Sequence, residues 1–121
     1  MTAVGAGIDR VPKNVGSLVG SSVHLKCRFH HRSCKDMMWT SVGRSGIPSV
    51  LYSNNATSTL HGGRYSVNVS VFGECTLHIS RLELSDAGTF TCAEFIPGAK
   101  EQSSKTATVT VVGMQVYWFC E

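Results

Sequence analysis

The chain has 121 residues and a formal net charge of +3, and 42% of its residues are hydrophobic while 16% are charged. This length fits one domain with a single core, and this composition excludes an intrinsically disordered chain. The positive charge is small and scattered along the sequence, which excludes a nucleic-acid partner because such a protein needs a concentrated basic stripe.

Short alternating runs, separated by Gly, Pro, Asn and Ser, predict strands throughout the chain. The first predicted strand covers 23–29, where apolar residues at every second position alternate with polar ones. Further strands are expected at 37–42, 49–52, 65–69, 75–79, 90–95 and 106–112. No run of ten or more residues has a helical stripe, so the sequence predicts an all-β domain.

The five cysteines of the chain indicate disulfides and an oxidising compartment. We therefore expect a secreted protein or the extracellular part of a cell-surface membrane protein. Two N-glycosylation sequons, which start at Asn55 and Asn68, agree with that location. Four of the cysteines, Cys27, Cys34, Cys75 and Cys92, allow three disulfide connectivities. The fifth cysteine, Cys120, is left over.

Five landmarks occur along the chain in a characteristic order. They are residues 19–27, Trp39, residues 63–65, residues 77–82 and the run 86–92. Together they resemble the V-set of the immunoglobulin superfamily, over a stretch from about Ile8 to Val112. The additional run 50–52 separates a V-type from a constant-type domain. The resemblance implies an immunoglobulin V-type sandwich of two antiparallel sheets with Greek-key connections over residues 1–113, followed by a short aromatic tail at 114–121.

The resemblance also implies structural roles for particular residues. Cys27 is expected to pair with Cys92 beside Trp39. Cys34, in the loop between strands B and C of the family, is expected to pair with Cys75 at the start of strand E. The residues expected in the core are Trp39, Leu77 and Phe90, and those expected to form an ion pair at one end of the sandwich are Arg64 and Asp86.

Two departures from the family pattern narrow the class of protein. Phe90 stands where the family usually has a tyrosine, so a hydrogen bond worth roughly 0.5–1.5 kcal/mol is missing there. The stretch 99–106 lacks the Phe-Gly-x-Gly joining motif of rearranged antibody and T-cell receptor domains. The resemblance therefore implies a non-rearranging domain of an adhesion molecule or an innate or invertebrate immune-type receptor.

An apolar outer sheet face is the main functional expectation. An outward face this apolar is unusual unless something covers it, and V-type domains commonly pair through this face. We expect a protein partner on this face, either a second copy of the chain or another immunoglobulin-type domain. The alternative is that the loop between strands F and G, or the aromatic tail, covers this face within the monomer. The residues expected on this face are Thr40, Val42, Pro48, Val50, Tyr52, Thr91, Ala93 and Phe95.

A basic loop between strands B and C supports an alternative function, the binding of an anionic glycan or another polyanion. The residues expected at this loop site are His30, His31, Arg32, Lys35 and Ile96. Adjacent histidines do not converge easily on one tetrahedral ion, and no phosphate-binding loop, HExxH or GxSxG motif occurs. We therefore expect no metal, no cofactor and no enzymatic activity.

Overall fold

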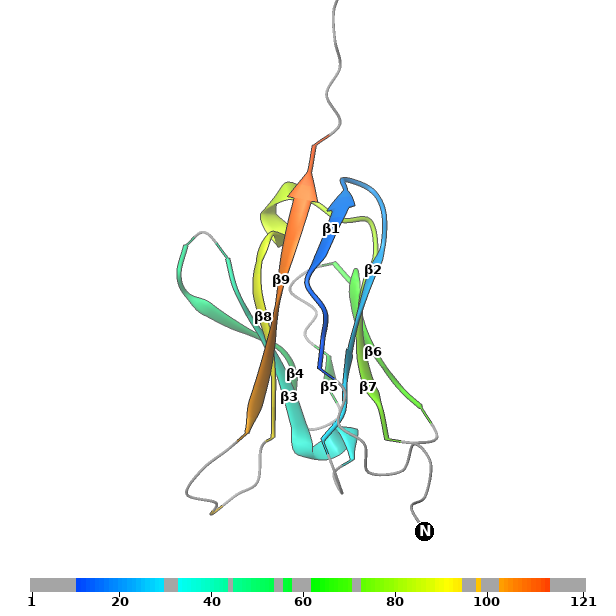
Figure 1. The fold of residues 1–121 in the computed structure, drawn as a ribbon, viewed down its shortest axis with the longest axis vertical. Coiled ribbons are helices and arrows are strands. Elements are labelled where there is room, and N and C mark those ends of the chain that lie inside the picture. Colours follow the sequence, from blue (N-terminus) through cyan, green and yellow to red (C-terminus); the bar gives the residue numbers. More distant parts are fainter. Residues whose placement is uncertain are drawn as a thin grey trace, which may run out of the picture.

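The structure, a computed structural model, describes residues 11–29, 33–43, 45–53, 56–57, 62–70, 73–94, 98 and 103–113. Two β-sheets pack face to face (Figure 1). Their strands are β1 (Val15–Leu18), β2 (Val23–Cys27), β3 (Met37–Val42), β4 (Pro48–Ser53), β5 (Ala56–Thr57), β6 (Tyr65–Val69), β7 (Cys75–Ile79), β8 (Gly88–Glu94) and β9 (Ser104–Val112). Two short 3-10 helices, η1 (Cys34–Asp36) and η2 (Leu84–Asp86), lie at opposite ends of the sandwich.

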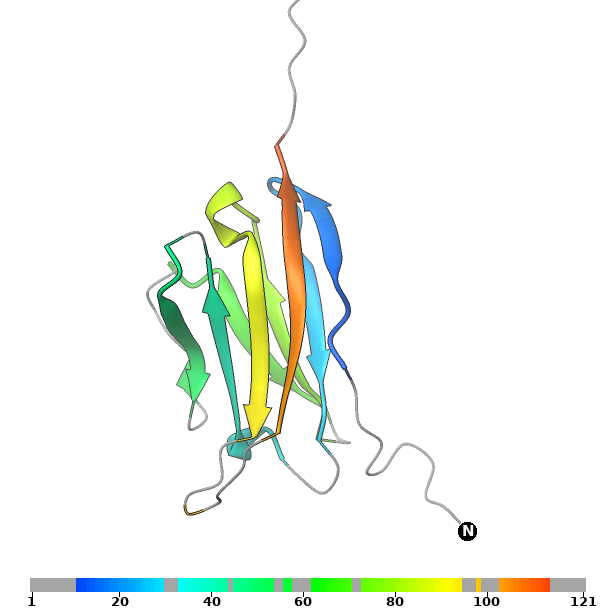
Figure 2. The same ribbon diagram turned by 60° about the vertical axis from the view of Figure 1, so that its left-hand side comes forward.

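The larger sheet has the strand order β1-β9-β8-β3-β4-β5. Figure 2 shows β9, β8, β3 and β4 of this sheet side by side. Neighbouring strands are antiparallel except at one edge, where β1 runs parallel to β9. The sequence analysis missed β1 and β5. β1 has four residues, one of which is a glycine, and β5 has two residues. Both strands are therefore too short to show a two-residue period.

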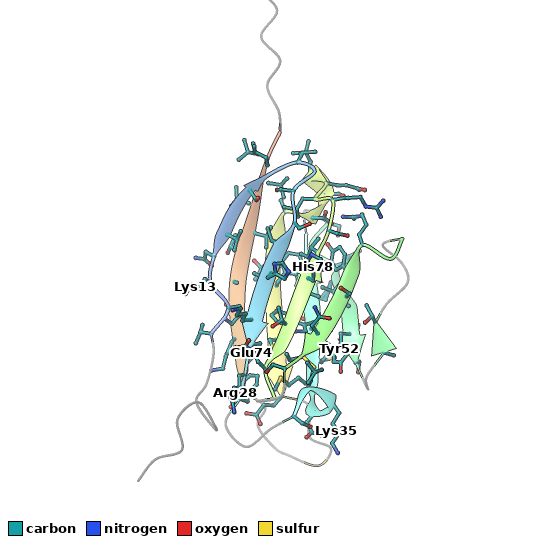
Figure 3. All side chains as sticks on the ribbon, turned by 90° about the vertical axis from the view of Figure 1, so that its right-hand side faces the viewer. Lys13, Arg28, Lys35, Tyr52, Glu74 and His78 are labelled. Carbon is teal, nitrogen blue, oxygen red and sulfur yellow. A yellow bond between two sulfur atoms is a disulfide. The ribbon has the colours of Figure 1, made fainter. Side chains whose placement is uncertain are left out.

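The smaller sheet has the order β2-β7-β6, and Figure 3 looks onto its outer face. The strands predicted at 65–69 and 75–79 coincide with β6 and β7. In β2 every second side chain is buried, as the alternation of apolar and polar residues predicted. On the outer face, the imidazole rings of His24 and His78 stack at a centroid distance of 4.3 Å, because these residues are opposite each other in the β2–β7 pairing.

The core between the sheets contains the residues that were expected there. Trp39, Leu77 and Phe90 are at most 1% exposed. Trp39 lies directly opposite Cys92 in the pairing of β3 with β8. The disulfide between Cys92 and Cys27 therefore joins the two sheets beside the indole, with the two Cα atoms 6.5 Å apart.

A second disulfide joins Cys34 of η1 to Cys75 at the start of β7, with a Cα–Cα distance of 5.2 Å. Both sulfur-bearing residues are buried. This bridge attaches the segment before β3 to the opposite sheet. Both disulfide pairings that the family resemblance implied are thus confirmed.

The expectation that Tyr52 lies on the outer face was wrong. Tyr52 is 4% exposed and belongs to the core. Thr40 pairs with Val50 but Trp39 pairs with Tyr52, so Leu51 is an extra residue in β4 and forms a β-bulge. A bulge reverses the alternation of side chains beyond it, and this places Tyr52 on the inner side together with Trp39.

Gly88, at the start of β8, is required by a close approach of two strands. A Cβ atom at this position would overlap the carbonyl oxygen of Val42 and lie 3.1 Å from the Cα of Gly43. Neither contact can be relieved by rotating a side chain, since both atoms belong to the backbone. The glycine of the run 86–92 is therefore a packing residue.

We expect Gly88→Ala to lower the free energy of unfolding by about 1–3 kcal/mol or more, since 1–3 kcal/mol is the usual cost of overpacking. Urea denaturation measures the change. The control is Gly16→Ala in β1, where a Cβ atom meets nothing within 4 Å; this substitution should stay within about 0.5 kcal/mol. Equal effects of the two substitutions would contradict the close approach.

Candidate functional site

The outer face of the larger sheet is formed by the outward side chains of β3, β4, β8 and β9. Val50 is 51% exposed and Pro48 is also exposed, while four other predicted residues are half-buried. Those half-buried members are Thr40, Val42, Thr91 and Ala93. Phe95, which was also expected on this face, lies outside the described residues. The structure thus brings six of the eight predicted residues together.

The strand pairing adds residues to this face that the sequence analysis did not name. Met38 pairs with Ala93, Thr89 with Val42, and Thr106 with Thr91. The alternation of side chains along a strand could have identified these residues, because a residue two positions from a known outward residue on the same strand shares its face. The additional outward residues are Met38, Thr89, Ser104, Thr106, Thr108 and Thr110.

The part of the combined face that the structure describes carries no formal charge. Every described outward position on β3, β4, β8 and β9 holds an apolar residue, a serine or a threonine. Lys, Arg, Asp and Glu are the residues that ordinarily cover solvated surfaces, and Lys, Asp and Glu are depleted at the cores of protein interfaces. The described outward positions, which include the exposed Val50 on β4, can therefore bury apolar area against a partner at no cost in charge desolvation.

An ion pair between Arg64 and Asp86, as expected, closes one end of the sandwich. Arg64 Nη1 lies 2.7 Å and Nη2 lies 3.1 Å from the two carboxylate oxygens of Asp86, so the pair is bidentate. The backbone N–H of Glu83 also donates to Asp86, at 2.7 Å. The side chains of Arg64 and Asp86 are only 9% and 2% exposed.

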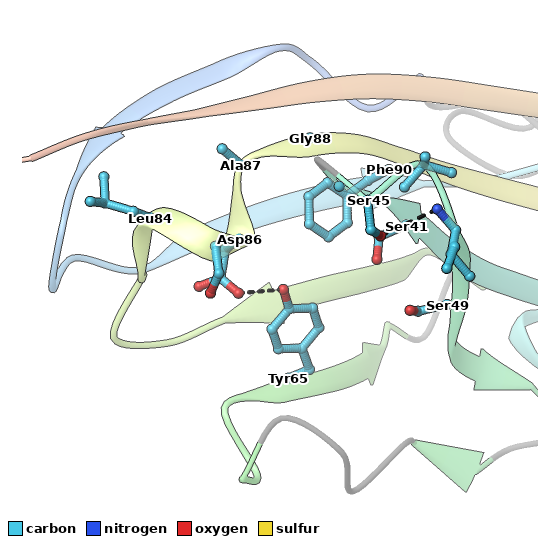
Figure 4. A pocket seen from close by; sticks show the side chains of 13 residues that line it. Ser41, Ser45, Ser49, Tyr65, Leu84, Asp86, Ala87, Gly88 and Phe90 are labelled. Carbon is cyan, nitrogen blue, oxygen red and sulfur yellow. Dashed lines mark hydrogen bonds between the residues drawn. The ribbon is translucent and has the colours of Figure 1, made fainter.

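Tyr65 completes this cluster, and the sequence analysis did not assign it a role. Its hydroxyl donates to Asp86 Oδ1 at 2.6 Å (Figure 4). Phe90 lies in the same region and has no hydroxyl to offer. Tyr65 therefore supplies the tyrosine hydrogen bond that Phe90 cannot make at this end of the domain. Tyr65 lies on β6 of the smaller sheet, whereas Phe90 lies on β8 of the larger sheet.

The cluster shifts the ionisation of its members. Burial alone raises the pKa of Asp86, but hydrogen bonds from Arg64, Tyr65 and the Glu83 backbone outweigh it, so the net pKa is lowered. Burial is the largest cause that raises the pKa of Tyr65, and the hydrogen bond to Asp86 adds to it. The hydrogen bond to Asp86 raises the pKa of Arg64. These shifts indicate a structural ion pair that stays charged at neutral pH.

Tyr52 has a structural role in place of the expected one. Its hydroxyl oxygen lies 3.4 Å from Cys34 Sγ. Since that sulfur is part of a disulfide and carries no hydrogen, the tyrosine is the donor. Burial raises the pKa of Tyr52. Tyr52 thus packs beneath the Cys34–Cys75 bridge.

The opposite end of the sandwich carries several positive side chains. Arg28 and Lys35 lie at this end (Figure 3), and Lys105 Nζ is 4.9 Å from the centroid of the Phe29 ring. Lys35 is exposed in η1, whereas Arg28 is 8% exposed. Of the loop site expected from the sequence, Lys35 lies among the described residues, and His30, His31, Arg32 and Ile96 lie outside them.

One of the two glycosylation sequons falls on a described strand. Asn68 and Ser70 are exposed at the end of β6, on the smaller sheet. A glycan on Asn68 would leave the outer face of the larger sheet free. Asn55 and Cys120 lie outside the described residues, as does the tail at 114–121.

A cavity of about 420 Å³ lies beside the ion-pair cluster, and we refer to it as the end cavity (Figure 4). The loop and strand segments on either side of the β3–β4 turn form one wall, and η2 with the residues after it forms the other. Tyr65, Asp86 and Phe90 also line it. Four serines line the cavity, Ser41, Ser45, Ser49 and Ser85, and its apolar members include the exposed Ile47 and Leu84.

Two other features are absent from the described residues. No group of three or more His, Cys, Asp or Glu side chains among them could hold a metal ion. Within the same ranges, no helix is long and apolar enough to cross a membrane. The uncharged outer face thus remains the feature that defines a candidate site.

Two packed sheets joined by a buried disulfide beside a tryptophan define an immunoglobulin-type sandwich. The family model of the immunoglobulin V-set domain matches residues 10–112. The chain therefore belongs to the immunoglobulin V-set family, and it is a recognition domain of the immunoglobulin type.

Among solved structures, the crystal structure of the RIG-5 IG1 homodimer is similar to this chain. The two share 17% sequence identity with a TM-score of 0.68, and the match covers 84% of this chain and 92% of that one. At this identity the likeness shows the fold. No curated protein matches the chain.

Proposed function

We propose that the chain is an extracellular recognition domain of an adhesion or immune-type receptor that binds a protein partner through the outer face of its larger sheet. The partner is a second copy of the chain or another immunoglobulin-type domain. The observation that carries this proposal is the absence of charge from every described outward position of β3, β4, β8 and β9.

The extent of this face over four adjacent strands fits the proposed partner. A standard interface buries about 800 Å² on each side, and a face of four adjacent strands can supply such an area. Two copies would bring identical faces together about a two-fold axis, as in most homodimers. The neighbour RIG-5 IG1, which has the same fold, is a homodimer. The two disulfides and the described sequon at Asn68 support an extracellular location.

Sedimentation at several protein concentrations tests the proposal. We expect the natural chain to self-associate and Val50→Asp to raise the dissociation constant at least about 30-fold, since disrupting a hot-spot residue of an interface costs about 2 kcal/mol or more. The introduced carboxylate would have to be buried without a partner.

The matched control is Val69→Asp. Val69 is 58% exposed on β6 of the smaller sheet, so the same substitution places the same charge on the other side of the domain. Self-association should not change in this variant. A chain that is monomeric at its highest soluble concentration, or equal weakening by both variants, would contradict self-recognition through the outer face.

The second candidate function is the binding of a polyanion at the opposite end of the domain. It rests on the basic loop between β2 and β3 and on Arg28, Lys35 and Lys105. These three residues lie at the end of the sandwich where β2 leads into that loop. Such binding is electrostatic and is weakened by salt, because surface charges are screened over about 8–10 Å at physiological ionic strength.

Retention on a heparin column measures this second function. Replacing Arg32 and Lys35 by serine should lower the salt concentration at which the chain elutes. The charge-matched control replaces Lys13 and Arg81, two exposed residues away from this end. If the two double variants elute at the same salt concentration, the interaction depends only on net charge and the loop site is wrong.

A further inference from the structure

The end cavity lies next to the point where the chain leaves the sandwich. η2 packs beside β9, and a Cβ atom at Gly113, directly after β9, would lie 3.8 Å from Cδ2 of Leu84. Leu84 is one of the residues that line the cavity. Gly113 therefore lies at the rim of the end cavity.

Two apolar side chains at the rim of the cavity are exposed to solvent. Ile47 is 70% exposed and Leu84 is 54% exposed, and they are two of the large hydrophobic side chains with the highest exposure among the described residues. They come from the two walls, which are separate in sequence but face the same space. An apolar group placed between them would remove both from water.

The interior of the cavity is partly polar. The hydroxyls of Ser41, Ser45 and Ser49 are available as acceptors or donors along one wall. Ser45 already accepts a hydrogen bond from the backbone N–H of Ile47 at 3.3 Å, and its oxygen can accept another. This combination suits an aromatic side chain with one polar edge, because Tyr and Trp need a hydrogen-bond partner when they are buried.

The segment after Gly113 contains such side chains. Residues 114–120 read Met, Gln, Val, Tyr, Trp, Phe, Cys and carry no charge. Trp118 offers the largest apolar surface and a single N–H donor. Five extended residues span at most about 18 Å, so Trp118 can fold back from Gly113 over Leu84.

We propose that the end cavity binds the indole of Trp118, so that the segment after β9 folds back onto the end of the sandwich. Ile47 and Leu84 enclose the ring, and a serine hydroxyl accepts its N–H. This site involves the end of the domain, and the proposed function depends on the outer face of the larger sheet, so each proposal is tested by different substitutions.

Fluorine NMR of the full chain labelled with 5-fluorotryptophan tests the proposal. The chain has two tryptophans, so two signals are expected, and Trp118→Phe identifies the signal of Trp118. We expect that signal to differ in chemical shift from free 5-fluorotryptophan and to move toward it in Leu84→Ser and in Ser45→Phe, which fills the cavity.

Val69→Ser is the control, because it removes an exposed valine far from the cavity, and the Trp118 signal should not move in this variant. The signal of Trp39 reports whether each variant is folded. A Trp118 signal at the position of the free amino acid, unchanged by both cavity variants, would overturn the proposal. A signal that moves to the free position on tenfold dilution would also overturn it, by showing that the indole comes from a second copy.

Discussion

Arg64→Met should lower the free energy of unfolding by about 3–5 kcal/mol, the cost of removing one partner from a buried ion pair. The Asp86 side chain is 2% exposed, so its carboxylate would stay in the interior without its bidentate partner. Urea denaturation at pH 7 measures the loss. Tyr65→Phe should cost about 1.5–3 kcal/mol, since the lost hydrogen bond has a charged acceptor.

Glu83→Gln is the control for the ion pair. Glu83 Oε2 lies 3.3 Å from Arg64 Nε, but its side chain is 59% exposed, and exposed ion pairs contribute about 0–1 kcal/mol. Arg64→Met combined with Asp86→Leu should recover part of the stability, because it removes both buried charges. If Arg64→Met were no more harmful than Glu83→Gln, the ion pair would not be a major stabilising contact.

The lowered pKa of Asp86 also predicts the pH dependence of stability. The unfolded chain has the ordinary aspartate value of 3.8 and the folded chain a lower one, so the folded state holds the proton less tightly. The carboxylate therefore contributes its full stabilisation above the unfolded pKa and loses it as the pH falls through the folded pKa. The difference in stability between the natural chain and Asp86→Asn should be constant near neutral pH and shrink below about pH 4.

Removal of the disulfide between the sheets should have an effect of similar size. Cys27 and Cys92 are 65 residues apart, and cross-linking a loop of that length stabilises a fold by about 4 kcal/mol in the chain-entropy description. The double variant Cys27→Ala, Cys92→Ala should lose about this amount, which is a large part of the roughly 5–15 kcal/mol that holds a domain folded. Denaturation curves measured by tryptophan fluorescence give the change.

The second disulfide provides the comparison. Cys34 and Cys75 are 41 residues apart, so the chain-entropy term differs from that of the first bridge by only a few tenths of a kcal/mol. The first bridge is the one beside the buried Trp39. We expect the variant without it to be the less stable of the two, because it also creates a cavity against the indole. A loss below about 1 kcal/mol on removing Cys27 and Cys92 would contradict this role.

Much of the fold follows from local patterns in the sequence. The alternation at 23–27 and 75–79 requires one face of each strand to be buried, and the spacing of Cys27, Trp39 and Cys92 is specific enough to imply the sandwich. Each predicted strand overlaps a strand of the structure, and those predicted at 37–42, 65–69 and 75–79 coincide with β3, β6 and β7. The edge strands β1 and β5 could not be predicted, because they are short and are held by hydrogen bonds to a neighbouring strand.

Tyr52 shows why the pattern alone could not place every residue of the outer face. A sequence with strict alternation would put Tyr52 beside Val50 on the outside, but Leu51 is an extra residue in the pairing with β3. Whether a strand contains a bulge depends on the register of two strands, and register is a property of the assembled sheet.

Local patterns and the family resemblance were enough to predict the sandwich, the buried disulfide beside Trp39 and the partners in the Arg64–Asp86 ion pair. The tertiary structure alone decided that Tyr65 donates to that ion pair, that Tyr52 is internal, and that the outward positions of four strands form one uncharged surface. The physical reason is that alternation and landmark spacing act along a single strand. Contacts between strands instead depend on register and on the distance between sheets, which the chain acquires only on folding.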